Sequence, residues 1–285
     1  MKRIFATIAL AGLLGQVHAA ERRVATADQL ATFFKSTTYV VTTNDNIIFD
    51  AFLNDAVKRF WTTTPYKVVD KAGFDTLRTN ENNSFLMLTK VIESKDKLKR
   101  PYIYLSLLMG SKEAESDLDL MPEVASIPLA CESAEGDIPT MMLNPMVIFV
   151  QKHAEKSKEK SFKDRLLANF QQRLQAYNYN MSQLKGKIVY ICKSDVDIKV
   201  NIREMEAKHS MLRFVDKEDI ARVVSEKEAN AAVAFAVYPQ GSEKGAYGYK
   251  MVMDADGALY YYYYETKPKN FLFQKNDFDM LISNL

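Results

Sequence analysis

Histidine and cysteine, on which much nucleophilic and metal chemistry depends, are scarce in this chain. Its 285 residues include three histidines and two cysteines. His153 and His209 have no nucleophile motif beside them, and the sequence carries no HExxH, G-x-S-x-G, Walker or G-x-G-x-x-G motif. Zinc sites and hydrolases built on a Ser-His or Cys-His pair are therefore disfavoured. We predict no catalytic residue, no metal and no cofactor; a carboxylate-based hydrolase is the remaining enzymatic alternative.

The N-terminus has the pattern of a secretory signal peptide. Met1–Arg3 is basic, and Ile4–Leu14 is apolar but too short to span a bilayer. Val17-His18-Ala19 then places small residues at −3 and −1 of a signal-peptidase site. We expect a signal peptide over residues 1–19, cleaved after Ala19, and a periplasmic or secreted mature protein without a transmembrane segment. No cysteine follows the apolar stretch, which disfavours a lipid anchor; a buried N-terminal helix is the alternative.

The sequence also lacks the features that attract phosphate groups. Its ten glycines are scattered and form no glycine-rich loop. Its 38 basic residues fall to 36 when Lys2 and Arg3 leave with the signal peptide, and 36 acidic residues remain, so the formal net charge becomes zero. A neutral protein has no electrostatic attraction to nucleic acid or anionic lipid. We therefore expect no nucleic-acid partner.

Cys131 and Cys192 are the two cysteines. In an oxidising compartment they allow one disulfide. Both stand among apolar residues, however, and two buried thiols are the alternative. The sequence alone leaves this choice open.

One pattern is present twice. Residues 38–77 and 188–223 both read as a β-branched strand, a polar loop, an amphipathic helix, a second strand ending in Val-Asp-Lys, and a short helix. Three further strands and a closing helix follow each copy. The predicted strands are 84–91, 102–109 and 124–131 in the first copy, and 231–238, 247–253 and 258–265 in the second.

This pattern predicts an α/β (α+β) fold. Two tandem copies of a β-α-β-α-β-β-β-α unit would each form a mixed sheet packed with helices. The first unit covers residues 20–155 and the second covers 186–285. Residues 156–185 are expected to form a linker helix that leaves the first unit, crosses solvent and packs on the second.

The amphipathic helices of the two copies share a spacing. Apolar residues recur at i, i+4, i+7 and i+11, and we expect both sets, with His209 in the place of Phe60, to face a core. Asp70 and Asp216 are predicted to cap the following short helices, and Asn144-Pro145 is predicted to start the helix that closes the first unit. The two sets are Phe49, Leu53, Ala56 and Phe60, and Ile198, Ile202, Met205 and His209.

The words YVVTTND, AFLNDAVKRF and YKVVDKAGF resemble the start of small α/β domains of bacterial envelope proteins. These are the N-terminal domain of TolB and the periplasmic domain of LpoB-type activators of penicillin-binding proteins. The resemblance covers about half of each copy. It implies a binding or scaffolding module of the cell envelope and carries no catalytic residues. This chain departs from TolB in having no propeller and from LpoB in having no lipobox.

Candidate partner residues stand where the two copies differ. Five consecutive tyrosines, 260–264, predict a strand in which Tyr260, Tyr262 and Tyr264 share one face and Tyr261 and Tyr263 the other. The second set is either covered by helices or exposed to a protein or glycan. Trp61 is either a staple over a helix end or an exposed anchor. Asp117 and Asp119 belong to an acidic insertion, 111–123, which is a surface loop or a calcium site.

These observations favour a non-enzymatic binding or scaffolding protein of the bacterial cell envelope. Its partner would be an envelope protein or a glycan. The alternative is a small-ligand or glycan binder that uses the groove between the two units.

Overall fold

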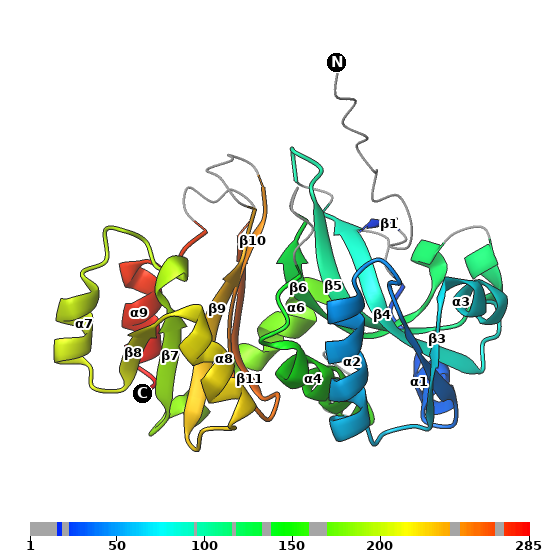
Figure 1. Cartoon of the computed structure of the whole chain (residues 1–285), viewed down its shortest axis with the longest axis horizontal. Coiled ribbons are helices and arrows are strands. Elements are labelled where there is room, and N and C mark those ends of the chain that lie inside the picture. The colour runs from blue at the N-terminus through cyan, green and yellow to red at the C-terminus, as the bar shows by residue number, and fades with distance from the viewer. Residues whose placement is uncertain are drawn as a thin grey trace, which may run out of the picture.

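The computed structural model describes residues 16–18, 23–93, 96–115, 118–132, 138–159, 170–239, 246–265 and 271–285. These residues form two mixed sheets that lie side by side along the long axis of the molecule (Figure 1). The helices α2 and α4 lie between the sheets, α3 lies beyond the first sheet, and α7 and α9 lie beyond the second. The fold is therefore α/β, as predicted.

The first sheet and its helices come from the first half of the chain. Their bounds are β1 (Gln16–His18), α1 (Ala27–Phe33), β2 (Thr37–Val41), α2 (Ile47–Phe60), β3 (Tyr66–Val69), α3 (Lys71–Leu77), β4 (Asn83–Ile92), β5 (Pro101–Met109), the 3₁₀ helices η1 (Lys112–Glu115) and η2 (Leu118–Leu120), β6 (Glu123–Cys131) and α4 (Leu143–Lys156).

The second half begins with helical turns and then repeats the pattern. Its elements are α6 (Phe170–Gln175), η3 (Ala176–Leu184), β7 (Ile188–Cys192), η4 (Lys193–Asp195), α7 (Ile202–Lys208), β8 (Leu212–Val215), α8 (Lys217–Ser225), β9 (Ala231–Val237), β10 (Gly248–Met253), β11 (Leu259–Glu265) and α9 (Lys275–Ile282).

The two sheets share one topology. The strand order β3-β2-β4-β5-β6 of the first sheet matches β8-β7-β9-β10-β11 of the second. In both, the first three strands are parallel and the last two join in antiparallel pairs. The predicted tandem copies are therefore confirmed. The first sheet has one addition, because β1 pairs with the end of β4 at Lys90–Ile92, beyond the last residue of β2.

The units stack head to tail, with equivalent faces pointing the same way. Strand register places Met87 and Phe235 at equivalent positions. Met87 faces outward, into a small core made with Phe74 of α3 and with Met121 of the insertion. Phe235 faces inward, into the largest core, which also contains Leu53 of α2 and residues of α4. The helices of the first unit therefore cover the inward face of the second sheet. The equivalent face of the first sheet points outward, away from the second unit.

The predicted helix face is correct for the main part of α2 in the first unit but only partly correct in the second unit, where Ile202 and Met205 pack against a core without being fully buried. Phe49, Leu53 and Ala56 of α2 are buried. In contrast, α7 has seven residues and none is buried, and Ile198 precedes it at 97% exposure. Asn201 starts this helix by accepting from the amide of Glu204 at 3.2 Å. The polar cap, rather than the apolar spacing, sets where α7 begins, and His209 ends it instead of facing a core.

The other predicted caps have mixed outcomes. Asp70 caps α3 by accepting from the amide of Gly73 at 2.9 Å. Asp216 stands at the start of α8, but its carboxylate pairs with Lys193 at 3.4 Å and makes no capping bond. The prediction that Asn144 caps α4 is wrong, because the cap is Met142, two residues earlier, and Pro145 lies within the first turn.

The predicted linker is only partly correct where it is described, because η3 packs on the second unit, with Asn178 accepting from the Tyr262 amide at 2.7 Å, but does not cross solvent. Residues 160–169 lie outside the described residues. The helix α4 continues to Lys156 with His153 buried, and η3 packs back on it, since the Tyr177 ring lies 5.2 Å from Phe149. Leu174 of α6 is buried in the largest core. The described linker elements therefore lie between the sheets, because their apolar residues complete the shared core.

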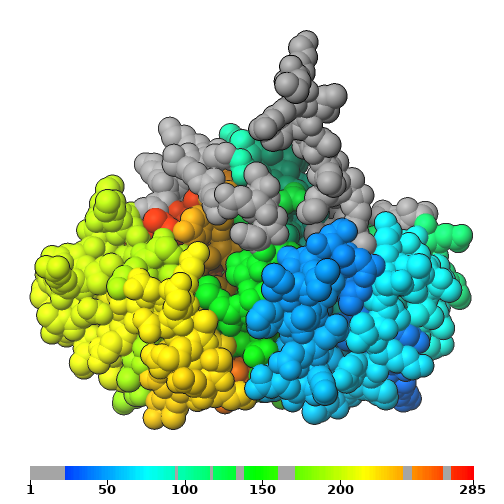
Figure 2. Space-filling model, in the orientation of Figure 1, coloured from blue at the N-terminus to red at the C-terminus, as the bar shows by residue number. Residues whose placement is uncertain are grey.

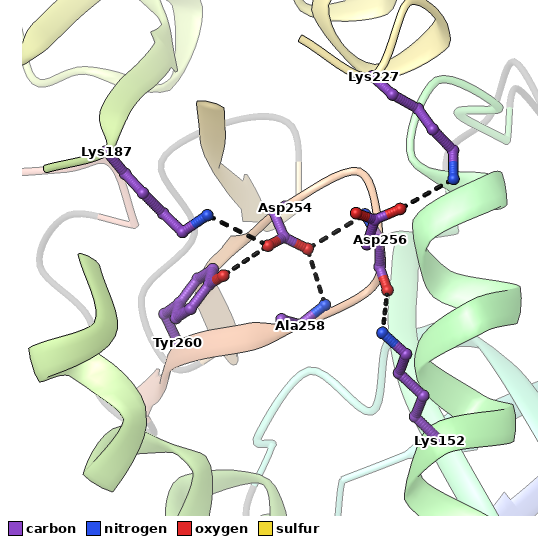
Figure 3. Close-up of polar contacts among 7 residues, drawn as sticks. All are labelled: Lys152, Lys187, Lys227, Asp254, Asp256, Ala258 and Tyr260. Atoms are coloured by element: carbon purple, nitrogen blue, oxygen red, sulfur yellow. Dashed lines mark hydrogen bonds and ion pairs between the residues drawn. The ribbon is translucent and has the colours of Figure 1, made fainter. Parts of the chain in front are cut away.

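A hairpin turn of the second unit joins it to the first (Figure 3). Gly257 has φ +73°, and a Cβ there would lie 2.7 Å from both the Phe149 amide nitrogen and the Pro145 carbonyl oxygen of α4. Lys152 of α4 donates to the Asp256 carbonyl oxygen at 2.8 Å, and Lys227 pairs with the Asp256 carboxylate at 2.8 Å. The hydrogen bond from Lys227 holds the pKa of Asp256 below its usual value. The turn thus fits α4 through its shape and through the hydrogen bond from Lys152, while Lys227 holds the turn from within the second unit.

This fit predicts unequal costs for two glycine substitutions. Gly186→Ala places a Cβ in open space at φ +80°, so it should cost only the left-handed conformation, about 1–2 kcal/mol of unfolding free energy. Gly257→Ala adds a collision with α4 and should cost about 2 kcal/mol more. Chemical denaturation of both variants measures the difference. Equal costs would contradict the tight docking of the turn.

His153 predicts a pH dependence of stability. Burial, then Arg173 and Lys156, lower its pKa from 6.5 to about 3. The unfolded chain therefore binds a proton that the folded chain excludes, so this stability is complete above pH 6.5 and declines as the pH falls toward 3. The expected loss between pH 6.5 and 5 is about 2 kcal/mol. Denaturant titrations should show this step in the parent chain and in His209→Gln, but not in His153→Gln; a step that persists in His153→Gln would assign it elsewhere.

Candidate partner-binding surface

Trp61, one predicted anchor, is buried at the end of α2. Its side chain is 6% exposed and belongs to the largest core. The indole nitrogen donates to the Thr64 hydroxyl at 3.1 Å. Trp61 is therefore a staple over the helix end, and the alternative of an exposed anchor is wrong.

The tyrosine strand is largely covered. Tyr261 is buried in the outer core of the second unit, beside α9, and the half-buried Tyr263 stacks on it at 6.4 Å. Lys250 lies 5.9 Å from the Tyr263 ring and is itself buried in an ion pair with Asp277 at 2.6 Å. These two tyrosines therefore serve the packing of α9, and Tyr261 is not an exposed partner surface.

The predicted alternation of tyrosines is wrong at one position. The pairing of β10 with β11 shifts register between Val252 and Met253. Tyr260 consequently lies with Tyr261 in the outer core, while Tyr262 and Tyr264 face the other side. The Tyr260 hydroxyl donates to Asp254 at the start of the hairpin turn (Figure 3). A β-bulge of this kind places two successive side chains on one face.

The acidic insertion mostly covers the outer face of the first sheet. Ala114 and Met121 are buried there. Asp119 is buried as well, and Asp117 lies outside the described residues. Within the described part of the chain, no three His, Cys, Asp or Glu side chains are grouped so as to hold a metal ion.

Cys131 and Cys192 are not joined in a disulfide. Cys192 is buried at the end of β7, where its sulfur lies 3.1 Å from the Ser194 hydroxyl. Cys131 is half-buried at the end of β6. The disulfide is therefore not formed, and of the two thiols only that of Cys192 is buried.

The space between the units holds a buried polar network. This is the place where the alternative function, a small-ligand or glycan binder, would have its groove. One carboxylate oxygen of Glu93, at the end of β4, accepts from Tyr249 at 2.8 Å, from Gln171 at 2.8 Å and from Tyr104 at 3.2 Å. Tyr262 donates to the Gln171 side-chain oxygen. The network joins both sheets and α6, so these polar groups already serve one another.

A second polar contact between the units joins β5 to the residue that precedes β10. The Tyr102 hydroxyl donates to the Tyr247 carbonyl at 2.7 Å and accepts from its amide at 2.8 Å. Burial raises the pKa of Tyr247 to about 12, and burial, with Tyr104 and Glu93 nearby, raises that of Tyr249 well above its ordinary value. The Tyr249 hydroxyl therefore remains protonated well above neutral pH and donates to Glu93.

The apolar surface that the structure does expose lies on α2. Ile47 is 79% exposed, Ile48 70% and Phe52 51%. Ile48 and Phe52 are four residues apart and therefore neighbours on the helix surface. The space-filling view shows α2, in blue, on the front of the molecule (Figure 2). The sequence does carry a signal for this exposed face. The run Ile47-Ile48-Phe49 has more apolar residues than one buried stripe of a helix requires.

The edge strand β3 adds to the exposed apolar area of the first unit. Val68 pairs with Val40 and lies on the same face of the sheet. Val40 is buried, whereas Val68 and Tyr66, on the edge strand, are exposed. Of the large apolar residues exposed among those described, five belong to these two elements. The set is Ile47, Ile48, Phe52, Tyr66 and Val68, against Leu98, Tyr179 and Ile198 elsewhere.

Comparisons with protein-family models, with curated proteins and with solved structures found no match to this chain. Among the described residues, none of the helices has both the length and the apolar character that crossing a bilayer requires. The surface on α2 and β3 is therefore interpreted from its own geometry.

The Glu93 network predicts that a buried tyrosine hydroxyl contributes more to the unfolding free energy than a half-exposed one. Tyr249→Phe removes a buried donor to a carboxylate and should cost about 1.5–3 kcal/mol of unfolding free energy. Tyr190→Phe is the matched control, because its hydroxyl also donates to a carboxylate, Glu228, but at a half-exposed site, and should cost less than about 1 kcal/mol. Denaturant unfolding compares the two. If Tyr249→Phe lowered the unfolding free energy by less than Tyr190→Phe does, the network would not hold the units together.

Proposed function

We propose that this protein is a non-enzymatic binding or scaffolding protein of the bacterial cell envelope, which engages a partner protein through α2. The observation that carries the proposal is the exposed face of Ile47, Ile48 and Phe52 on two successive turns of one helix. Single exposed apolar side chains are ordinary, whereas a grouped set is typical of interaction sites.

The buried polar groups support a structural role for the rest of the molecule. His153 lies 3.0 Å from the Tyr177 hydroxyl, between the units. Glu93, Tyr104 and Tyr249 hold the two sheets together. The residues best suited to acid–base chemistry are thus used in packing, which favours binding over catalysis.

The envelope location rests on the expected signal peptide, residues 1–19, and on the resemblance to envelope domains of the TolB and LpoB types. Cleavage after Ala19 would also remove β1 from the first sheet, since that strand is Gln16–His18. The mature first unit would then keep the strand order that the second unit shows. Fractionation of the native cell, with N-terminal sequencing of the recovered chain, tests this part.

The partner surface predicts position-specific crosslinking. A photoreactive residue at position 52 should give one discrete crosslinked product in envelope extracts. The same residue at position 198 is the matched control, because Ile198 is an exposed apolar residue of the other unit. Unlabelled parent chain should compete with the product, and a chain carrying Ile48→Asp should compete at least tenfold less well because a charge disfavours an apolar contact.

Thermal unfolding of the Ile48→Asp chain should match the parent, since this side chain is exposed and buries little on folding. Equal crosslinking at positions 52 and 198, or equal competition by the Ile48→Asp chain, would contradict the proposal.

A further inference from the structure

A groove of about 500 Å³ lies on the first unit, away from α2. It opens between the segment before α1, the turn before β4 and the acidic insertion. Its volume is in the range of sites for small molecules. The lining residues are Arg23, Val24, Thr26, Gln29, Glu81, Ser111, Lys112, Glu113, Leu120 and Pro122.

Backbone contacts fix the groove walls. Gly110 approaches the turn so closely that a Cβ would lie 2.0 Å from the Asn80 carbonyl oxygen. The amides of Gly110 and Ser111 donate to the carbonyls of Asn83 and Arg78, each at 2.9 Å. These bonds place Lys112 beside Glu81.

The opposite wall is fixed in the same way. The amide of Glu123 donates to the Arg23 carbonyl at 2.6 Å, and the amide of Ala25 donates to the Glu123 carbonyl at 2.8 Å. Arg23 is thereby held against the insertion, where it pairs with Glu113. The groove is therefore built into the fold, although its charged side chains reach solvent.

Two ion pairs contribute both signs of charge to the lining. Arg23 pairs with Glu113, and Lys112 pairs with Glu81 at 3.4 Å. All four side chains are more than half exposed. Exposed pairs of this kind contribute little stability, so a ligand carrying both charges can replace them at small cost.

The remaining lining residues indicate which uncharged groups a ligand of this groove would have. Thr26 and Gln29 satisfy each other, because the Gln29 side chain accepts from the Thr26 amide at 2.9 Å and the Thr26 hydroxyl accepts from the Gln29 amide at 3.3 Å. Val24, Leu120 and Pro122 supply apolar surface. The lining thus offers two cations, two carboxylates and an apolar area.

We infer that this groove binds a small zwitterion with an apolar group, of the class of an apolar α-amino acid. The ligand carboxylate would pair with Lys112 and its ammonium group with Glu81, because this ion pair is the more exposed of the two. The apolar side chain would contact Leu120 and Pro122. A neutral sum of lining charges favours this class over an anion or a cation alone. The inference does not depend on the proposed partner surface.

Calorimetric titration of the full chain with leucine tests the assignment. We expect saturable binding in the millimolar range, and binding weaker by about tenfold for leucine amide, which lacks the carboxylate, and for N-acetylleucine, which lacks the ammonium group. Lys112→Gln and Glu81→Gln should each weaken leucine binding to a similar extent.

Lys208→Gln is the matched control, because Lys208 and Glu204 form an exposed ion pair on α7, in the other unit. It should leave leucine binding unchanged. Absence of saturable leucine binding, or binding unaffected by Lys112→Gln and Glu81→Gln in chains that unfold at the parental temperature, would overturn the inference. Equal affinity for leucine and N-acetylleucine would also overturn it, by assigning the groove to anions.

Discussion

A single buried carboxylate organises the centre of this molecule. Glu93 lies where the first sheet, the second sheet and the linker meet, and it accepts from donors on each of them. A carboxylate removed from water is tolerated only when donors replace its hydration, so its position requires all three elements to be correctly placed. Apolar burial supplies most of the driving force for stacking the units, but it is non-directional. The tyrosine and glutamine donors add the geometric requirement that fixes one arrangement.

The head-to-tail stack explains why two copies of one unit differ in their hairpins. In the second unit the connection between β10 and β11 is a short turn, because Gly257 must fit against α4. The equivalent connection in the first unit faces outward, and there it is long enough to bury Ala114 and Met121. The insertion and the turn are therefore two solutions for the same face of the sheet, one covered by its own loop and one by a neighbouring unit.

The sequence predicts the strands well and the surfaces poorly, for physical reasons. The strand β9 is apolar over its whole length and β4 is apolar or β-branched from Phe85 to Thr89, so local pattern and buried environment agree. The helix α7 fails because spacing alone cannot show that Asn201 caps it. Tyr260 fails because a bulge depends on the partner strand. Trp61 and the apolar face of α2 fail because exposure is decided by which elements cover them, which only the assembled units reveal.

Stacking of equivalent faces in one direction is open-ended in principle, since every added copy presents the same surface as the last. Two features set the outer faces of this pair apart from the faces that meet. At one end, the insertion occupies the face that a preceding copy would cover. At the other end, α9 turns Lys275, Asn276, Asp279 and Ser283 to solvent, whereas α4 at the equivalent place buries Phe149 and Val147 against its neighbours. The two outer faces of this pair therefore differ in chemistry from the two faces that meet, and neither offers a further copy the contact that joins these two units.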